Sequence, residues 1–227
     1  MKLVKKIKLN HNVYKLTFQS SEKLEEMQVS SCVKIYDDKG NFRFYTPISK
    51  KDYELVFSIK EYPTGLLSKY ICNLPINRFI NISHFLSKRK YIPNEFNKIL
   101  FVAGGTGLTP CTQVIFDIVE NKNDKTDILL INCNTTEQDV FLNDLLNNLN
   151  SIDSVEIKQV ITSKTGHLTA SHLNNLCNGK KYDFVYVCGP PGFMKTVSGD
   201  KTADKKQGEL KGVLKELEYS ENTVYKF

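Results

Sequence analysis

The sequence predicts two domains, an antiparallel β-barrel followed by an α/β domain with a doubly wound parallel sheet. Short strand-like runs separated by turn residues fill the N-terminal part, whereas continuous apolar strands alternate with helical segments in the rest. Hydrophobic residues make up 41% and charged residues 25% of the 227-residue chain, as in a globular protein with a substantial core. We expect residues 1–93 to form the barrel and residues 94–227 the α/β domain.

The barrel is predicted from the period and composition of its strands. The segments 13–18 and 33–36 are rich in β-branched and aromatic residues, and the second is closed by the turn signal Asp37-Asp38-Lys39-Gly40. The segment 53–60 alternates apolar and polar residues, as a strand with one buried face does. Residues 66–73 are expected to form a short helix.

The second half changes to an alternation of strands and helices. The apolar run 99–103 is typical of a parallel strand that is buried on both faces. The expected helices cover residues 110–121, 139–149 and 169–176, and the further strands cover residues 128–132, 155–161 and 183–188. This order predicts a parallel sheet with helices on both faces.

Charge and cysteine usage limit the possible functions. The net charge of +6 is too small to indicate nucleic-acid binding by itself, but it suits an acidic protein partner. The six cysteines form no Cys-x-x-Cys pair, so no zinc or iron–sulfur site is expected and the thiols are interpreted as reduced. No apolar run near the N-terminus is long enough for a signal peptide or a membrane helix. We expect a soluble, cytoplasmic protein, with membrane association through a missing N-terminal anchor as an open alternative.

The first motif is Arg43-Phe44-Tyr45-Thr46-Pro47-Ile48-Ser49. Arginine offers a planar fork for phosphate, and a tyrosine ring can stack on a flat heterocycle. Alternation along a strand sends Arg43 and Tyr45 to the same side, and Thr46 and Ser49 add hydroxyl groups. An ordinary surface strand with an exposed arginine explains the segment about equally well.

The second motif is Gly104-Gly105-Thr106-Gly107-Leu108-Thr109-Pro110, directly after a predicted strand. Glycines allow backbone N–H groups to approach a diphosphate, and a helix N-terminus stabilises anions. We expect Thr109 to be the N-cap and Pro110 the first helical residue. The segment is neither a P-loop nor a full Gly-x-Gly-x-x-Gly fingerprint, and a plain tight turn is the alternative.

Two further motifs occupy a strand end and a helix start. Cys188-Gly189-Pro190-Pro191-Gly192 follows the last strong strand, and Tyr62-Pro63-Thr64-Gly65-Leu66-Leu67-Ser68 leads into the short helix of the barrel. Simple packing of the cysteine and an ordinary helix cap are the alternatives for each segment alone. The four motifs together, in this order and in these elements, favour a site for phosphate, a flat ring and a nucleotide.

On these motifs the chain resembles the ferredoxin-NADP reductase superfamily and, within it, the cytochrome b5 reductases, over nearly its whole length. The C-terminal segments 208–214 and 224–227 also resemble the family's ending. The resemblance implies FAD in the barrel and NADH or NADPH in the α/β domain. It further implies hydride transfer to the flavin and then single-electron transfer to cytochrome b5 or a similar acidic haem protein.

The resemblance also implies roles for individual residues. In the flavin domain, Arg43 and Ser49 would bind FAD, Tyr45 would stack on its ring, and Thr46 would lie near its redox-active edge. Ser68, with the backbone of Gly65 and Leu67, would hold the diphosphate. Lys60 would lie near the nicotinamide. In the other domain, Gly105, Thr106 and Gly107 would bind the nucleotide. Cys188 would position the nicotinamide, and Gly189, Pro190 and Met194 would line its pocket. Thr109 would approach the flavin, and Phe227 would lie near it. Thr46 and Cys188 are the expected catalytic residues, without a covalent role for the cysteine.

The segment 161–166 bears on the choice of nucleotide. NADH-preferring relatives tend to carry an acidic residue in this region, suited to a ribose hydroxyl. Here Ser163 and Lys164 resemble the Ser-Arg pair that takes the 2′-phosphate in NADPH-using relatives. We therefore expect NADPH to be used to an appreciable extent beside NADH.

Several alternatives remain open at the level of sequence. The chain departs from the family's pattern at Ser30 and Ser83, so a catalytically silent flavin-fold binding module is conceivable. A diaphorase or ferric reductase with another acceptor is the other alternative. The four histidines form no zinc pattern, and no metal is expected. The basic run Ser87-Lys88-Arg89-Lys90 is a candidate docking site for cytochrome b5, and we expect a monomer.

Overall fold

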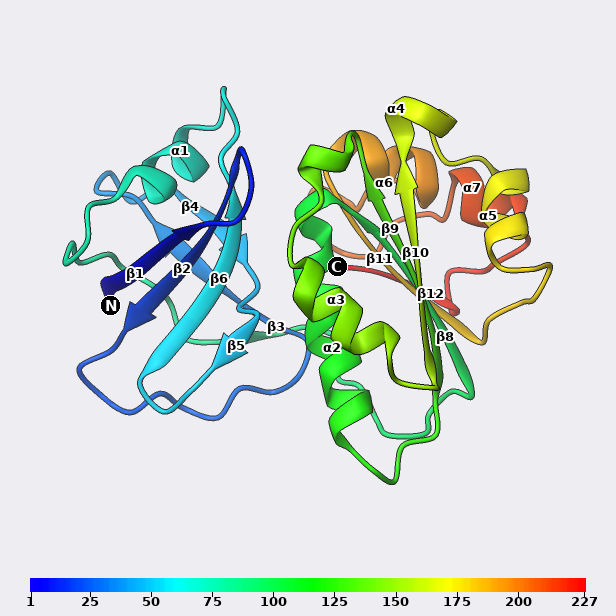
Figure 1. Cartoon of the computed structure of the whole chain (residues 1–227), viewed down its shortest axis with the longest axis horizontal. Helices are drawn as coiled ribbons and strands as arrows, with labels where there is room; N and C mark the ends of the chain where they lie inside the picture. The colour runs from blue at the N-terminus through cyan, green and yellow to red at the C-terminus, as the bar shows by residue number, and fades with distance from the viewer. The chain divides into compact units, whose positions relative to one another are not determined.

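The computed structural model describes residues 1–227, and its contacts divide the chain into two compact units. Unit 1 comprises Met1–Tyr91 with Thr112–Val114, and unit 2 comprises Ile92–Cys111 with Ile115–Phe227. Unit 1 is built from antiparallel strands and unit 2 from a parallel sheet with helices (Figure 1). The predicted fold class is therefore confirmed.

Unit 1 contains two antiparallel sheets. The first has the order β1-β2-β6-β5, with β1 at Lys2–Lys8, β2 at Val13–Gln19, β6 at Glu54–Lys60 and β5 at Ser49–Lys50. The second has the order β4-β3-β7, with β4 at Phe42–Tyr45, β3 at Ser31–Tyr36 and β7 at Leu86–Ser87. The inward residues of both sheets form one apolar core, which includes Leu16, Phe18, Val33, Ile35 and Phe57. Helix α1 at Leu66–Asn73 matches the range expected from the sequence and packs Ile71 into this core.

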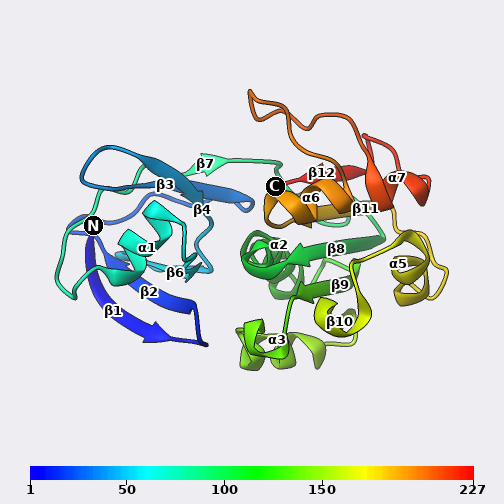
Figure 2. The same cartoon turned by 90° about the horizontal axis from the view of Figure 1, so that it is seen from above.

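Unit 2 contains a five-stranded parallel sheet in the order β10-β9-β8-β11-β12, which can be followed in Figure 2. Its strands are β8 at Lys98–Gly104, β9 at Asp127–Asn134, β10 at Val155–Ile161, β11 at Phe184–Cys188 and β12 at Val224–Lys226. From its second residue to its last, β8 is buried at every position, so both of its faces are covered. This is the burial expected of a central strand in a doubly wound sheet.

The helices of unit 2 connect these strands. The α-helices are α2 at Leu108–Glu120, α3 at Asn143–Asn150, α4 at Thr162–Thr165, α5 at Ala170–Leu176, α6 at Pro191–Val197 and α7 at Gly212–Glu216, and the 3-10 turns are η1 at Gly105–Gly107 and η2 at Glu137–Asp139. One face of the sheet, represented by Leu100 and Val102, packs against Leu173, Val197 and Leu214 of α5, α6 and α7. No helix of the chain combines the length and the hydrophobicity that a membrane span requires.

Two predicted helix starts are wrong. The helix expected from residue 110 begins at Leu108, because η1 continues directly into α2. The helix expected from residue 139 begins only at Asn143, because Leu142 has a left-handed backbone with φ 59°. The residues before it form η2, which is closed by a capping box between Thr136 and Asp139.

Aromatic rings stack along β11 and the C-terminus of unit 2. Phe96 stacks on Phe184 with ring centroids 4.5 Å apart. The ring of Tyr186 stacks on Phe101 at 5.2 Å and on Phe227 at 5.3 Å. The last residue of the chain is therefore seated on the sheet by ring contacts, and its N–H also donates to the Val187 carbonyl at 3.0 Å.

The C-terminal strand is also anchored by a buried lysine. Lys226 is 2% exposed, and its Nζ donates to the carbonyl oxygens of Glu209 at 2.7 Å, Asp200 at 3.3 Å and Gly208 at 3.5 Å. Burial lowers the pKa of this lysine, since the charged form is the costlier one to desolvate. The segment 200–209 is thus tied to β12 through its backbone.

Candidate functional site

The candidate flavin residues of unit 1 begin on β4. Arg43 and Tyr45 are two residues apart on this strand, so their side chains leave it on the same side. The Arg43 guanidinium is exposed, donates to the Phe42 carbonyl at 2.9 Å and forms no ion pair, so its charge is available to an anion. Burial raises the pKa of the Tyr45 phenol, which keeps this ring neutral at physiological pH.

The other predicted residues of this segment lie on the adjoining strands. Thr46 follows β4 and is half-buried, and the exposed Ser49 begins β5, where it pairs with Val56 of β6. Lys60 is the last residue of β6, and its Nζ lies 6.0 Å from the centre of the Tyr62 ring. The predicted flavin residues thus occupy β4, β5 and β6 and the turn that follows.

The turn from Tyr62 to Ser68 forms a compact entry to helix α1. The Ser68 hydroxyl accepts from the Tyr62 N–H at 3.2 Å and donates to the Gly65 carbonyl at 3.3 Å. A Cβ on Gly65 would stand 2.4 Å from the Ser68 Oγ and 2.9 Å from the Tyr62 Cβ, so a side chain at this position would displace the Ser68 hydroxyl. The first intrahelical bond runs from the Lys69 N–H to the Gly65 carbonyl at 3.0 Å, which leaves the three preceding N–H groups for a ligand.

A hollow of about 480 Å³ adjoins this helix start. It is lined by Pro63, Thr64, Gly65, Leu66, Lys69, Tyr70 and Asn73. The free N–H groups carry the positive end of the helix dipole, and the Lys69 side chain adds a full charge. These features fit a diphosphate, so the residues of unit 1 are compatible with FAD.

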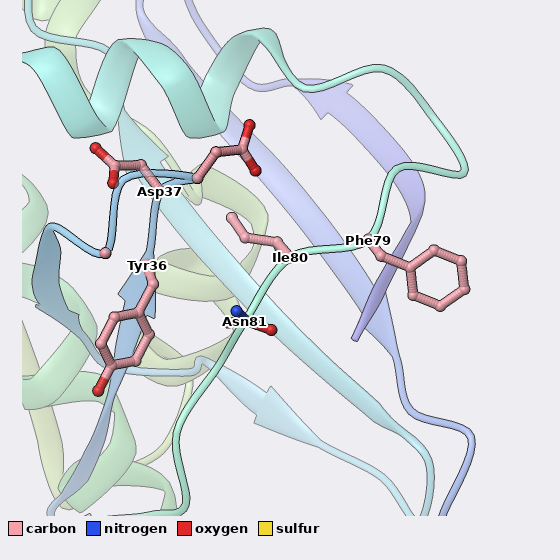
Figure 3. A pocket seen from close by; sticks show the side chains of 7 residues that line it. Tyr36, Asp37, Phe79, Ile80 and Asn81 are labelled. Carbon is pink, nitrogen blue, oxygen red and sulfur yellow. The ribbon is translucent and has the colours of Figure 1, made fainter.

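A second hollow of unit 1, of about 380 Å³, lies elsewhere (Figure 3). It is lined by Tyr36, Asp37, Asp38, Gly40, Phe79, Ile80 and Asn81, and no motif residue contributes to it. Its carboxylates already have partners, because Asp37 accepts from the backbone of Lys39 and Asn41 at 2.9 Å and Asp38 pairs with Arg78 at 3.2 Å. This hollow is therefore no candidate for the flavin.

The glycine-rich turn of unit 2 lies between β8 and α2. Gly105 has φ 52° and faces open space, since no atom lies within 4 Å of where its Cβ would be. Gly107 by contrast is packed against β11, because a Cβ there would stand 2.2 Å from the Cys188 carbonyl oxygen. Thr106 lies between them and is half-buried. The open backbone at Gly105 is where a phosphate could approach.

The predicted cap at Thr109 is wrong. Gly107 is the N-cap of α2, and Thr109 lies inside the helix, where its hydroxyl donates to the Thr106 carbonyl at 3.1 Å. Pro110 is accordingly the third helical residue rather than the first. The glycine turn itself performs the capping, so a side-chain cap is not needed.

Cys188 ends β11 and is half-buried. Burial raises the pKa of its thiol to about 12, so the thiol stays protonated at physiological pH. A protonated thiol is a poor nucleophile, which agrees with a positioning role.

The residues after Cys188 include an aromatic side chain that the sequence reasoning missed. A Cβ on Gly104 or Gly189 would meet the Phe193 ring at 2.7 Å or 2.3 Å, so this ring covers both glycines. Its signal in the sequence is an aromatic residue in the first turn after Pro190-Pro191. The neighbouring Met194, expected to line the pocket, is 8% exposed and packs in the apolar core, while Pro190 is exposed.

Ser163 and Lys164 lie in the short helix α4 directly after β10, and both are exposed. The Ser163 N–H donates to the Thr135 carbonyl at 3.0 Å. Lys164 is paired with Glu137, whose Oε1 lies 2.6 Å from its Nζ. Glu137 was not among the predicted site residues, although the turn after β9 that carries it could have been recognised by its Thr-Glu-x-Asp capping pattern.

No group of three or more His, Cys, Asp or Glu side chains in the structure could hold a metal ion.

Two family models match the two parts of the chain. The oxidoreductase FAD-binding domain model matches residues 1–91, and the oxidoreductase NAD-binding domain model matches residues 101–199. The FAD-binding match covers all the predicted flavin residues of the first part.

Curated proteins and solved structures give a consistent result. NADH-cytochrome b5 reductase 2-A of Vanderwaltozyma polyspora is 36% identical over 237 residues, covering 96% of this chain and 80% of that protein. NADH-cytochrome b5 reductase 2 of Lodderomyces elongisporus is 34% identical over 250 residues, covering 100% and 82% respectively. The cytochrome b5 reductase domain of Ulva prolifera nitrate reductase has the same fold, with a TM-score of 0.80 and 21% identity over 100% of this chain and 95% of that one. The motifs, the fold and these relatives together establish that the chain belongs to the NADH-cytochrome b5 reductase family.

Proposed function

We propose that this chain is an FAD-dependent reductase that oxidises NADH and passes electrons one at a time to cytochrome b5. Membership of the family supports the proposal. The observation that carries it is the pair of Arg43 and Tyr45 on β4, where an unpaired guanidinium and a neutral phenol leave the strand on the same side.

In unit 1 the residues bind and orient the cofactor. Arg43 and the free N–H groups at the start of α1 neutralise phosphate charge, while Ser68 keeps that helix start in shape. The Tyr45 ring would stack on the flat heterocycle, and Thr46 and Ser49 would offer hydroxyl groups at its edge. Lys60 is proposed to approach the nicotinamide. When bound, FAD accepts a hydride and releases electrons singly.

In unit 2 the residues hold the nucleotide. The turn Gly105–Gly107 would receive the diphosphate, and the protonated Cys188 thiol would pack beside the nicotinamide and orient it. Gly189 and Pro190 would line the nicotinamide pocket, Met194 would support it from the core, and Thr109 and Phe227 are proposed to approach the flavin. Thr46 and Cys188 are the residues that we propose to touch the reacting groups. Domain boundaries at 1–93 and 94–227 belong to the same proposal.

The acceptor is proposed to dock on basic residues of unit 1. Lys88, Arg89 and Lys90 follow β7, and the Lys88 Nζ lies 4.9 Å from the centre of the exposed Phe44 ring. A cation held over an exposed ring offers both charge and apolar area to an acidic haem protein. A monomer in the cytoplasm completes the proposal. NADH is the preferred donor, and NADPH is predicted to be a second, less efficient donor.

The test is a reduction series with the purified protein. We expect a yellow protein whose flavin absorbance is bleached by NADH without oxygen and restored by oxidised cytochrome b5, with reduction of the haem. A colourless protein that binds no added FAD would contradict the flavin assignment. A bleached protein that reduces ferric chelates or quinones but not cytochrome b5 would contradict the acceptor and favour the diaphorase or ferric reductase.

A further inference from the structure

The ion pair of Glu137 and Lys164 joins the turns that follow two neighbouring strands. Glu137 lies in η2, after β9, and Lys164 lies in α4, after β10. Because β9 and β10 pair in parallel, with Asn134 opposite Ile161, both turns leave the same edge of the sheet. The Ser163 N–H also donates to the Thr135 carbonyl, so the two turns are held together by backbone as well.

The same edge holds a buried amide without a partner. Asn134 is the last residue of β9 and is 4% exposed, yet neither its Oδ1 nor its Nδ2 has a hydrogen-bond partner in the protein. Buried polar groups are nearly always satisfied, so this amide is open to hydrogen bonds from a ligand or a water at this edge of the sheet. A nucleotide at the carboxyl end of β9 would bring hydroxyl and phosphate groups to this position.

The charges at this edge distinguish the two nicotinamide nucleotides. A 2′-phosphate carries almost two negative charges, and it would have to displace the Glu137 carboxylate from Lys164. The displaced carboxylate would then stand unpaired beside the phosphate. A 2′-hydroxyl can instead donate a hydrogen bond to the carboxylate and leave the ion pair intact.

We propose that Glu137 is a specificity-determining residue that favours NADH over NADPH by holding Lys164 and by accepting the ribose 2′-hydroxyl. The inference rests on the proposed function, in which the adenosine ribose lies at the carboxyl ends of β9 and β10. It places the acidic residue after β9, the second strand of the domain, and not after β10, the third. Lys164 lowers the pKa of Glu137, so the carboxylate is charged at neutral pH.

The variant E137Q tests the inference with little risk to the fold. Side-chain exposures of 62% for Lys164 and 70% for Glu137 make this a surface pair, which contributes little to stability. The matched control is E209Q, because Glu209 pairs with Lys211 at 3.0 Å with side-chain exposures of 70% and 64%. Neither substitution changes the shape of the side chain.

The first measurement is kcat/KM with NADH and with NADPH. In E137Q we expect the NADPH-to-NADH ratio to rise about tenfold or more, the effect of one hydrogen bond to a charged group. E209Q should leave the ratio unchanged, and K164A in the E137Q background should remove the gain. An unchanged ratio in E137Q with normal NADH oxidation would overturn the inference and leave the proposed function intact.

The second measurement is independent of activity. Isothermal calorimetry compares the binding of adenosine 2′,5′-bisphosphate with that of AMP to the wild type and to E137Q. Tighter binding of the bisphosphate to E137Q alone supports the inference, and equal binding to both proteins overturns it. This result stands even if NADH fails to reduce the protein, which would contradict the proposed function alone.

Discussion

Gly107 lies in direct backbone contact with Cys188. A Cβ on this glycine would stand 2.2 Å from the Cys188 carbonyl oxygen, closer than real Cβ atoms approach non-bonded heavy atoms. The turn after β8 and the end of β11 therefore depend on each other for their position within unit 2. The nucleotide turn and the strand-end cysteine form one backbone arrangement.

G107A should disturb both halves of this arrangement at once. We expect destabilisation of ~1–3 kcal/mol from overpacking, and loss of most of the NADH kcat/KM, because backbone must move to admit the methyl group. Thermal unfolding and NADH oxidation check both effects. G192A is the control, since nothing lies within 4 Å of a Cβ at that position of α6. Equal activity of G107A and wild type would show that the contact can relax without consequence.

R43K should lose flavin while it keeps the fold. Lysine retains the positive charge but not the planar fork, so we expect the FAD content of the purified protein to fall several-fold. The ratio of flavin to protein absorbance measures it, and thermal unfolding of the apoprotein checks the fold. R78K serves as the control, because Arg78 is already paired with Asp38 in the same unit. Equal flavin content in R43K and R78K would remove Arg43 from the site.

The Cys188 thiol should titrate far above physiological pH. Its pKa of about 12 means that the thiolate fraction rises about tenfold per pH unit from pH 6 to pH 10, without a plateau. Alkylation of this residue by iodoacetamide, followed by mass spectrometry, should show the same dependence. The pH profile of NADH oxidation should likewise be the same in wild type and C188A, whatever the loss in rate. A plateau in the alkylation rate below pH 9 would contradict the raised pKa.

The double variant K88E/K90E should slow electron transfer to cytochrome b5 selectively. Reversal of two charges should reduce kcat/KM for the haem protein by about tenfold or more at low salt, with convergence to wild type as ionic strength rises. Reduction of an uncharged quinone should stay unchanged, since it needs no steering. K215E/K211E is a control of equal charge change in unit 2. An equal effect of both double variants on cytochrome b5 would indicate net charge rather than a docking site.

Lys226 should make stability depend on pH in the alkaline range. Its pKa is lowered in the folded state, so above that lowered value the unfolded chain binds more protons and stability rises until the ordinary value of 10.5 is passed. Urea unfolding of wild type and K226M between pH 7 and pH 10.5 measures the effect. The stability of wild type relative to K226M should increase with pH, whereas K215M, which alters an exposed lysine of α7, should show no such trend.

The sequence predicted the strands of unit 2 better than its turns. The strand Lys98–Gly104 is apolar almost throughout, so its burial follows from composition alone. The start of α2 was misplaced, because the backbone of Gly105–Gly107 closes the helix and Thr109 is not needed as a cap. The start of α3 depends on the left-handed Leu142, and a leucine gives no signal for that conformation.

Candidate site residues could be predicted from the sequence where they belong to one short, contiguous motif. The two glycines of η1 and the tyrosine of β4, which we propose as ligand contacts, lie at positions that a short motif defines. The partner of Lys164 lies 27 residues away, after another strand, so no local pattern could pair it with Glu137. Phe193 was missed for the same reason, since its contacts with Gly104 and Gly189 arise only when β8 and β11 lie side by side.

The stacked rings of Tyr186 and Phe227 make aromatic spectroscopy sensitive to the position of the C-terminus. The chain contains no tryptophan, so near-ultraviolet circular dichroism and intrinsic fluorescence of the apoprotein come from tyrosine and phenylalanine alone. Tyr186 is fully buried between Phe101 and the C-terminal ring, so we expect its asymmetric environment to give a dichroic band in the near ultraviolet. Near-ultraviolet circular dichroism should therefore report whether the Phe227 ring is packed on Tyr186, without an added label.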